Sequence, residues 1–231
     1  MNYLILLASG SGKRMHNTTP KQFIEVQDKP LIFYSLNTFE HNENIDEVVI
    51  VTKRKYFKKI YQIIEDYSFE KVHLLVEGGK FRQVSTYNAL EALKGFALKN
   101  DIIIVHDAAR PLVSNDDINN LIKAMDKHTS ASLGTKVVDT TIKIKNKKFQ
   151  ELLSRDNLIN IQTPQAFRYN QILKAHKKAL KDNITNATDD AQLMSLINKK
   201  YYIVEGSKQN FKITTENDLL LLEALLRRKQ L

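Results

Sequence analysis

The sequence contains no cysteine among its 231 residues. This excludes disulfide bonds and thiolate metal sites, and it suits a reducing compartment. No apolar run approaches the roughly 18 residues of a membrane-spanning helix. The opening segment Met1 to Ala8 leads into a glycine turn, where a signal peptide would have its cleavage site. We therefore expect a soluble, cytoplasmic protein with no membrane partner.

Two further classes of function find little support in the composition. The six histidines lie too far apart for the spacing of a zinc site built by the protein. The formal net charge is +9, from 35 Lys and Arg against 26 Asp and Glu, and such a balance can indicate a nucleic-acid partner. The cations are spread along the chain, however, which favours solvated faces. We expect no nucleic-acid partner, although a non-enzymatic nucleotide or nucleic-acid binder stays open as an alternative.

Short apolar segments alternate with helical patterns along most of the chain. The apolar, β-branched runs predict buried strands, and the stretches between them carry apolar residues at helical spacing. The predicted strands cover residues 3–8, 46–52, 71–79 and 101–111, the last of them ending in polar residues. The pattern predicts an α/β fold: an open, mostly parallel twisted sheet with helices on both faces. The length predicts one domain over residues 1–231.

The pattern changes after Ala131. Alternation in VVDTTIKIK predicts an exposed hairpin, because its lysines would not be tolerated inside a buried sheet. We interpret residues 133–157 as a protruding β-arm. Helices are then predicted at 165–180 and 188–197, a strand at 201–206 and a closing helix at 215–229, with Thr215 as N-cap.

A glycine-containing loop with cations follows the first predicted strand. LLASGSGKRM lacks the third glycine of a dinucleotide fingerprint and the Lys-Ser or Lys-Thr of a Walker loop, so it matches neither. Backbone N–H groups of such a loop can still approach phosphate oxygens, with Lys13, Arg14 and Lys21 neutralising the charge. An ordinary strand-to-helix turn is the alternative.

The second candidate motif is VHDAARP, at the end of the fourth predicted strand. Asp107 is expected at the same edge of the sheet as the glycine loop, where its carboxylate can hold Mg²⁺ against phosphates. Alternatively, Asp107 caps a turn or forms an ion pair with Arg110. Together, the carboxylate, the cations and the glycine loop indicate a nucleoside-triphosphate site for displacement at phosphorus.

Eight ordered motifs carry a resemblance to a known family. These are LLASGSGKRM, PKQF, GGKFRQVS, VHDAARP, DTTIK, QTPQAF, ATDDA and NFKITT. In this order and spacing the chain resembles the 2-C-methyl-D-erythritol 4-phosphate cytidylyltransferases of isoprenoid precursor synthesis, and the resemblance covers residues 2–228. It implies that the open α/β fold is that of a Rossmann-like nucleotidyltransferase. The related ribitol-5-phosphate cytidylyltransferases typically have Val at the position of Ala109 and lack the TDDA run.

The resemblance implies transfer of CMP from CTP to a polyol phosphate, with release of pyrophosphate and Mg²⁺ as cofactor. It implies triphosphate-binding, catalytic roles for Arg14, Lys21 and Lys212. The nucleotide-binding positions that it implies are Ala8, Ser9, Gly10, Gly12, Gly78, Gly79, Ser85 and Asp107, the last also lying near the metal.

The resemblance also implies a homodimer in which the arm of one subunit completes the site of the other. The acceptor-binding positions are Arg110, Thr140, Arg155 and Thr163. Thr140 could equally be an ordinary strand residue and Arg155 a member of a surface ion pair.

Three departures from the family pattern bear on the loop and the acceptor. Ser9 stands where the family usually has Ala or Gly, and His16 where Gly is common. The chain has no tryptophan, and Ile159 follows Leu158 where the family commonly has one. Ribitol 5-phosphate or another alditol phosphate, used in cell-surface polymer synthesis, is therefore the alternative acceptor.

Overall fold

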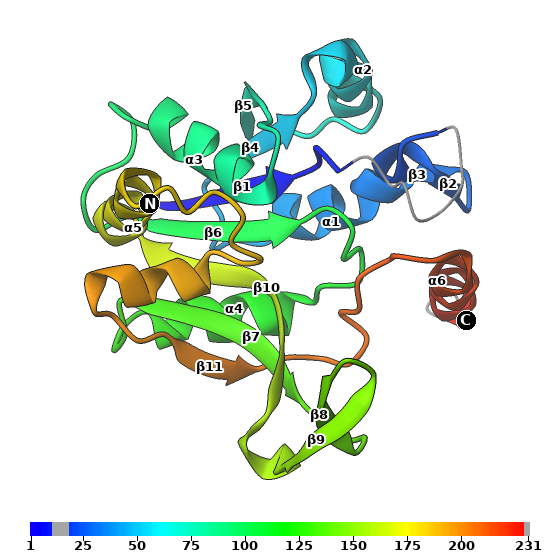
Figure 1. Cartoon of the computed structure of the whole chain (residues 1–231). Helices are drawn as coiled ribbons and strands as arrows, with labels where there is room; N and C mark the ends of the chain where they lie inside the picture. The colour runs from blue at the N-terminus through cyan, green and yellow to red at the C-terminus, as the bar shows by residue number, and fades with distance from the viewer. Residues whose placement is uncertain (11–18, 229–231) are drawn as a thin grey trace.

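A central seven-stranded sheet organises the chain. The computed structural model describes residues 1–10 and 19–228, and the strand order in the sheet is β11-β7-β10-β6-β1-β4-β5 (Figure 1). The strands are β1 (Asn2–Leu7), β4 (Glu47–Thr52), β5 (Val72–Glu77), β6 (Ile102–Asp107), β7 (Ser130–Lys136), β10 (Ile159–Arg168) and β11 (Tyr202–Glu205). The mostly parallel α/β fold expected from the sequence is confirmed.

One strand runs against the others. β10 pairs antiparallel with β6 and with β7, whereas β1 pairs parallel with β4 and β6, β4 with β5, and β7 with β11. The register between β10 and β7 shifts between Ile161 and Gln165. This irregularity lies beside the end of β6 and brings Thr163 against the backbone of Asp107.

Helices cover both faces of the sheet. One apolar cluster joins the sheet to α1 (Leu31–Glu40), α2 (Phe57–Asp66) and α4 (Asn115–Ala124). The other joins it to α3 (Arg82–Ala92), α5 (Tyr169–Lys181) and the 3-10 helix η5 (Ala191–Ile197). Alternate residues of β1 point to opposite clusters, which explains why this strand is a continuous apolar run.

A smaller cluster lies beyond the carboxyl ends of the strands. The short strands β2 (Glu25–Val26) and β3 (Lys29–Pro30) pack there with α6 (Glu216–Arg228), which the chain reaches after crossing the sheet edge (Figure 1). Thr215 Oγ1 accepts a hydrogen bond from the Asp218 N–H, as expected of an N-cap. This cluster holds the late segment around Ile213 close to the end of β6.

An exposed hairpin extends away from the sheet. β8 (Thr141–Lys145) and β9 (Lys148–Leu153) form a separate antiparallel ladder (Figure 1). It is shorter than the predicted arm of 133–157, because residues up to Lys136 belong to the buried strand β7. One face of the hairpin is apolar and exposed, and its residues are Ile142, Ile144, Phe149 and Leu152.

Two predicted helix boundaries are wrong. Gln165 to Arg168 extend β10 and pair with β6, so the helix α5 begins only at Tyr169. Residues 191–197 form a 3-10 helix, where the sequence predicted a helix over 188–197. Within the described part of the chain, no helix combines the length and apolar character needed to span a bilayer.

Candidate active site

A cavity of about 450 Å³ opens where β1, β4, β5 and β6 end. The predicted residues that line it are Ala8, Ser9, Gly10, Lys21, Gly79, Ser85, Asp107 and Lys212. The sequence expectation that the ends of the first and fourth predicted strands and the late lysine share one site is therefore matched by the geometry. Gly12 and Arg14 lie outside the described residues.

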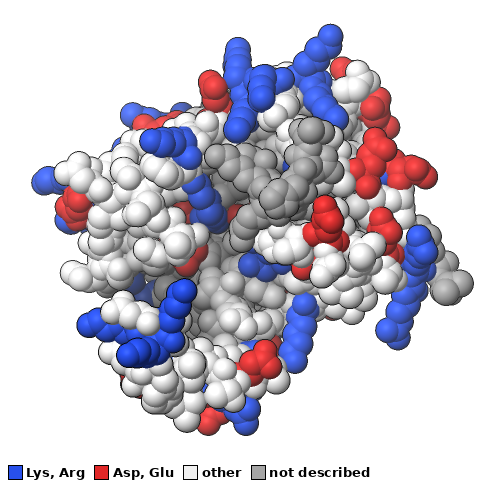
Figure 2. Space-filling model, turned by 45° about the vertical axis from the view of Figure 1, so that its right-hand side comes forward, with Lys and Arg blue, Asp and Glu red and all other residues white. Residues whose placement is uncertain are grey.

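The cavity lining is strongly cationic. Among the described residues that line it, five are cationic and one is anionic, namely Lys21, Lys53, Lys80, Arg82 and Lys212 against Asp107. In Figure 2, lysine and arginine side chains surround a hollow on one face, and others lie scattered over the same face. Such a concentration of positive charge is repulsive unless an anion binds there, so the cavity suits a polyanion.

Asp107 is the centre of the charge arrangement. Only 7% of its surface is exposed, and its carboxylate accepts from Arg82 Nε at 3.2 Å and from Lys212 Nζ at 2.6 Å. Burial alone would raise the pKa of Asp107, but the charges of Arg82 and Lys212 outweigh it and hold the pKa far below the usual range. The sequence alternative of an ion pair with Arg110 is wrong, because these two cations take that place.

The segment around Lys212 is tied to the turn after β6. Ile213 N–H donates to Ala109 O at 2.8 Å, and Lys21 Nζ donates to the Ile213 carbonyl. Lys21 lies at the start of the short helix η2 (Lys21–Phe23), just behind Pro20. These contacts bring Lys21, Lys212 and Asp107 to one wall although they are distant in sequence.

Close packing between two loops explains one glycine. A Cβ at Gly78 would lie 2.0 Å from Ser9 Oγ, so a larger residue would push the first loop out of place. Ser9 Oγ donates to Val51 O at 3.1 Å, which fixes the loop to the end of β4. Ser85 Oγ accepts from Gly79 N–H and donates to Phe81 O, both at 3.1 Å. The two loops are thus held together by their small residues.

A directional hydrogen-bond chain supports the backbone of the Asp107 turn. Asp107 N–H donates to Thr163 Oγ1 at 3.0 Å, and the hydroxyl lies 3.2 Å from His106 Nδ1. His106 Nε2 lies 3.1 Å from the Arg110 carbonyl, which can only accept, so Nε2 donates and Nδ1 accepts. Burial lowers the pKa of His106 to about 4, which keeps the ring neutral in this arrangement. Thr163, predicted to bind the acceptor, is itself only 5% exposed.

A second cavity of about 370 Å³ lies beside the first and shares Lys212 with it. Arg110 lines it, and Arg110 Nη1 donates to Asn210 O at 2.8 Å. The predicted residues Thr140 and Arg155 are both exposed and do not line it. Arg155 Nη1 reaches its rim by donating to Val138 O at 3.2 Å. The structure therefore brings Arg110 to this cavity and leaves the hairpin residues outside it.

Comparison with known proteins identifies the architecture. Residues 3–228 match the family described as 2-C-methyl-D-erythritol 4-phosphate cytidylyltransferase. The chain belongs to this family. A Clostridium botulinum member, the 2-C-methyl-D-erythritol 4-phosphate cytidylyltransferase of strain ATCC 19397, is 41% identical over 97% of both chains. The Clostridium acetobutylicum enzyme of the same name is 40% identical over the whole of both chains.

Solved structures agree with this assignment. The 4-diphosphocytidyl-2C-methyl-D-erythritol synthase of Anaerococcus prevotii superposes with a TM-score of 0.84 at 29% identity, covering 98% of this chain and 96% of that one. The 2-C-methyl-D-erythritol 4-phosphate cytidylyltransferase of Francisella tularensis gives 0.82 at 29% identity, covering 96% and 98%. The recognition and fold class expected from the eight motifs are confirmed, and the nucleotidyltransferase class follows from the family.

Three cationic residues of the cavity lining were missed by the sequence reasoning. Arg82, Lys53 and Lys80 line the nucleotide-sized cavity, but no role was assigned to them. Lys53 was interpreted as part of a solvated basic cluster, and Arg82 and Lys80 stand inside the quoted GGKFRQVS motif. The signal that could have identified Arg82 is its position three residues after Gly79, in a motif that directly follows a strand.

The described side chains offer few ligands for the Mg²⁺ that the family resemblance implies. Among the described residues, no group of three or more histidine or acidic side chains could hold a metal ion. The cavity offers a single carboxylate, Asp107, surrounded by cations. This fits a Mg²⁺ that arrives with a triphosphate and takes most of its ligands from phosphate and water, rather than a metal caged by the protein.

Proposed function

We propose that this protein transfers CMP from CTP to 2-C-methyl-D-erythritol 4-phosphate and releases pyrophosphate, in isoprenoid precursor synthesis. The observation that carries the proposal is the cationic cavity at the ends of β1 and β6, with one buried carboxylate on its wall. Relatives that share about 40% of the sequence bear the name of this activity. The absence of cysteine and of a membrane-spanning helix among the described residues supports a cytoplasmic location.

The cations would act on the triphosphate. Attack by the acceptor phosphate on the α-phosphorus of CTP builds negative charge on the equatorial and leaving oxygens. Lys21 and Lys212, held on one wall by backbone and carboxylate contacts, are positioned to neutralise that charge. The family resemblance assigns the same role to Arg14. Because these groups are already fixed, little reorganisation is needed during the reaction.

The base and ribose would lie against the two small-residue loops. The cavity is lined on one loop by Ala8, Ser9 and Gly10, and on the other by Gly79 and Ser85. The close approach of Gly78 to Ser9 keeps the two loops near each other. A slot of this kind, bordered by backbone N–H and C=O groups, favours a pyrimidine over a purine on size. We assign cytosine recognition to these loops.

Mg²⁺ would enter with the nucleotide. Asp107 is the described carboxylate that could hold it, and the ion would supply charge neutralisation at the triphosphate. Arg82 and Lys212 keep Asp107 ionised in the meantime.

The acceptor would occupy the second cavity. Arg110 lines that cavity, and Lys212 borders both cavities, so an acceptor phosphate near Lys212 would lie next to the α-phosphate of CTP. Thr163 supports the turn between the two.

We further propose a homodimer in which the hairpin packs on a second copy of the chain. Ile144, Phe149 and Leu152 are 60%, 67% and 62% exposed, and the described part of their own subunit leaves them uncovered. Exposed apolar patches of this kind mark interaction sites. Docking would also carry Thr140 and Arg155 to the partner's acceptor cavity.

The decisive experiment measures pyrophosphate release by the purified protein. CTP is paired in turn with methylerythritol phosphate and with ribitol 5-phosphate, and UTP, ATP and GTP serve as nucleotide controls. We expect release with CTP and methylerythritol phosphate at least tenfold faster than with any other pair. Faster turnover of ribitol 5-phosphate would reject the proposed acceptor while leaving the cytidylyltransferase chemistry.

A further inference from the structure

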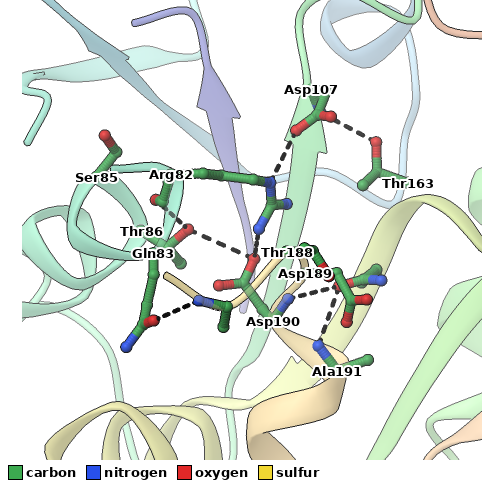
Figure 3. A network of polar contacts seen from close by, with 12 residues as sticks. Arg82, Gln83, Ser85, Thr86, Asp107, Thr163, Thr188, Asp189, Asp190 and Ala191 are labelled. Carbon is green, nitrogen blue, oxygen red and sulfur yellow. Dashed lines mark hydrogen bonds and ion pairs between the residues drawn. The ribbon is translucent and has the colours of Figure 1, made fainter. Parts of the chain in front are cut away.

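A buried chain of charges runs from the cavity wall into the interior (Figure 3). Arg82 donates from Nε to Asp107 and from Nη1 to Asp190 Oδ2, so one guanidinium bridges two carboxylates. Asp190 Oδ1 in turn accepts from His176 Nε2 at 3.1 Å. The chain therefore links a residue in the cavity to two residues behind it.

Asp190 and His176 are out of reach of any substrate. Both have 0% of their surface exposed, and neither lines either of the two cavities described above. Burial would raise the pKa of Asp190, but Arg82 and His176 outweigh it and lower that pKa. A buried charge is costly without such a partner, so the pair Arg82–Asp190 is held as a unit.

Further hydrogen bonds fix Asp190 in one orientation. Its backbone N–H donates to Gln165 Oε1 at 3.2 Å, and Thr86 Oγ1 donates to its carboxylate at 3.4 Å. Gln83, next to Arg82 on α3, accepts from the Ala187 N–H at 2.9 Å. Asp190 is thereby anchored to α3 and to β10 at once, which makes it a rigid support for the guanidinium.

Arg82 alone would not keep Asp107 in a fixed orientation. Its side chain is 20% exposed, it lines the cavity, and among the described residues its Nη2 has no hydrogen-bond partner. An arginine held at only one carboxylate could rotate toward the triphosphate, because phosphate is a strong bidentate partner. Asp190 occupies Nη1 and keeps Nε directed at Asp107.

We propose that Asp190 is a positioning residue for catalysis: through Arg82 it holds the Asp107 carboxylate in the orientation that the nucleotide site requires. The inference rests on the proposed cytidylyltransferase activity and assigns a role in it to the TDDA segment. It separates Asp190 from its neighbour Asp189, whose carboxylate accepts from the Gln192 N–H on the side of η5.

The first test compares Asp190→Asn with Asp189→Asn. Asparagine keeps the shape of each side chain and removes its charge. We expect kcat of Asp190→Asn to fall ten- to hundredfold with less than threefold change in KM for CTP, and both constants of Asp189→Asn to stay within twofold. Rates are taken well below the melting temperature of each variant and divided by the number of CTP-binding sites found by calorimetry. An unchanged kcat per site for Asp190→Asn would overturn the proposal.

A double-mutant cycle shows whether Asp190 acts through Arg82. In an Arg82→Met background, Asp190→Asn should lower kcat less than twofold further, because the connection is already lost. Arg82→Lys should not restore the rate, since an ammonium cannot bridge both carboxylates as the planar guanidinium does. An effect of Asp190→Asn that is equally large in both backgrounds would contradict the proposal.

A crystal structure of Asp190→Asn gives a readout that needs no activity. We expect the Asp107 carboxylate to lose its contact with Arg82 Nε or to occupy more than one rotamer. An Asp107 superimposable on that of the unmodified protein would reject the positioning role. Failure of the unmodified protein to release pyrophosphate would instead reject the proposed function, and this structural comparison would still decide the inference.

Discussion

The two neighbouring cavities differ in how completely one chain builds them. The nucleotide cavity gathers residues from the ends of four strands, and its charged wall is fixed by ion pairs to Asp107 and by Lys21 at the Ile213 carbonyl. The second cavity has Arg110 on its wall, whereas Thr140 and Arg155 stay exposed on or near the hairpin. On the proposed assignment, a single subunit builds most of the triphosphate site but leaves the predicted acceptor residues Thr140 and Arg155 outside the acceptor cavity.

The difference follows from where each set of residues lies. The carboxyl ends of parallel strands converge by the geometry of the sheet, so loops after β1, β5 and β6 must meet. The hairpin belongs to no such layer, and its apolar face contacts no cover within the described chain. The proposed homodimer would complete the acceptor site by assembly, and each prediction below tests one side of this contrast.

The largest effect is expected from Lys21→Ala in the triphosphate site. Removal of a fixed cation from developing phosphate charge should lower kcat by about 10²–10³ with a much smaller change in KM for CTP. Steady-state pyrophosphate release measures both constants. Lys58→Ala, an exposed lysine on α2, is the matched control and should behave as the unmodified protein. Full activity of Lys21→Ala would refute the role of this lysine.

The second prediction concerns the proposed acceptor site and is tested by complementation between two variants. Arg155→Ala and Lys21→Ala should each lose at least 90% of the activity. If Arg155 acts in the partner's site, subunit exchange between the two variants yields mixed dimers in which one of two sites is intact. About a quarter of the unmodified activity should then return.

The result of mixing is decided by which subunit supplies Arg155. If Arg155 served its own subunit, every site in a mixed dimer would carry one lesion, and no activity would return. Sedimentation of Phe149→Asp provides the control for assembly, since a charge on the apolar face of the hairpin should produce monomers. A fully active monomer would contradict the proposal that a second subunit completes the acceptor site.

The sequence predicted most of the sheet because its strands carry strong apolar patterns. β1, β4 and β6 are Ile-, Leu- and Val-rich, and the structure confirms all three. β10 was missed because its end, Gln165 to Arg168, continues smoothly into the helical spacing of α5. Pairing with β6 on one side and β7 on the other determines its conformation, and such tertiary contacts leave no local pattern.

The same limit applies to the site. Asp107 and the glycine loop were predictable because Asp107 ends one strand, the loop follows another, and the carboxyl ends of parallel strands share one edge of the sheet. Arg82 and Asp190 are 108 residues apart, and nothing in the spacing of GGKFRQVS and ATDDA indicates that they form an ion pair. The buried chain of ion pairs behind the cavity can therefore be recognised only in the folded structure.

The third prediction concerns His106, which belongs to the hydrogen-bond chain that supports the Asp107 turn. His106 connects Asp107, through Thr163, to the Arg110 carbonyl, and burial lowers its pKa to about 4. The unfolded state binds this proton up to about pH 6.5 and the folded state does not, so the free energy of unfolding should rise with pH between about 4 and 6.5. The contribution is on the order of 3 kcal/mol at most.

Urea unfolding across that pH range measures the effect. His106→Asn should flatten part of the slope, and His41→Asn, an exposed histidine, should leave it unchanged. The depressed pKa values of Asp107 and Asp190 act in a different window, because their stabilisation is present above about pH 4 and is lost as the pH falls below it. A slope that survives in His106→Asn would show that other groups carry it.

The smallest effect is expected from Ser9→Ala, where this chain departs from its family. Ser9 Oγ donates to Val51 O and packs against Gly78 outside the charged wall, so its loss should cost about 1 kcal/mol of stability and change kcat less than twofold. Thermal unfolding and pyrophosphate release test the two parts, with the exposed Ser154→Ala as control. A tenfold loss of kcat would mean that the Ser9 hydroxyl contacts the bound nucleotide. The cavity would then use a group that the family pattern, with Ala or Gly at this position, does not supply.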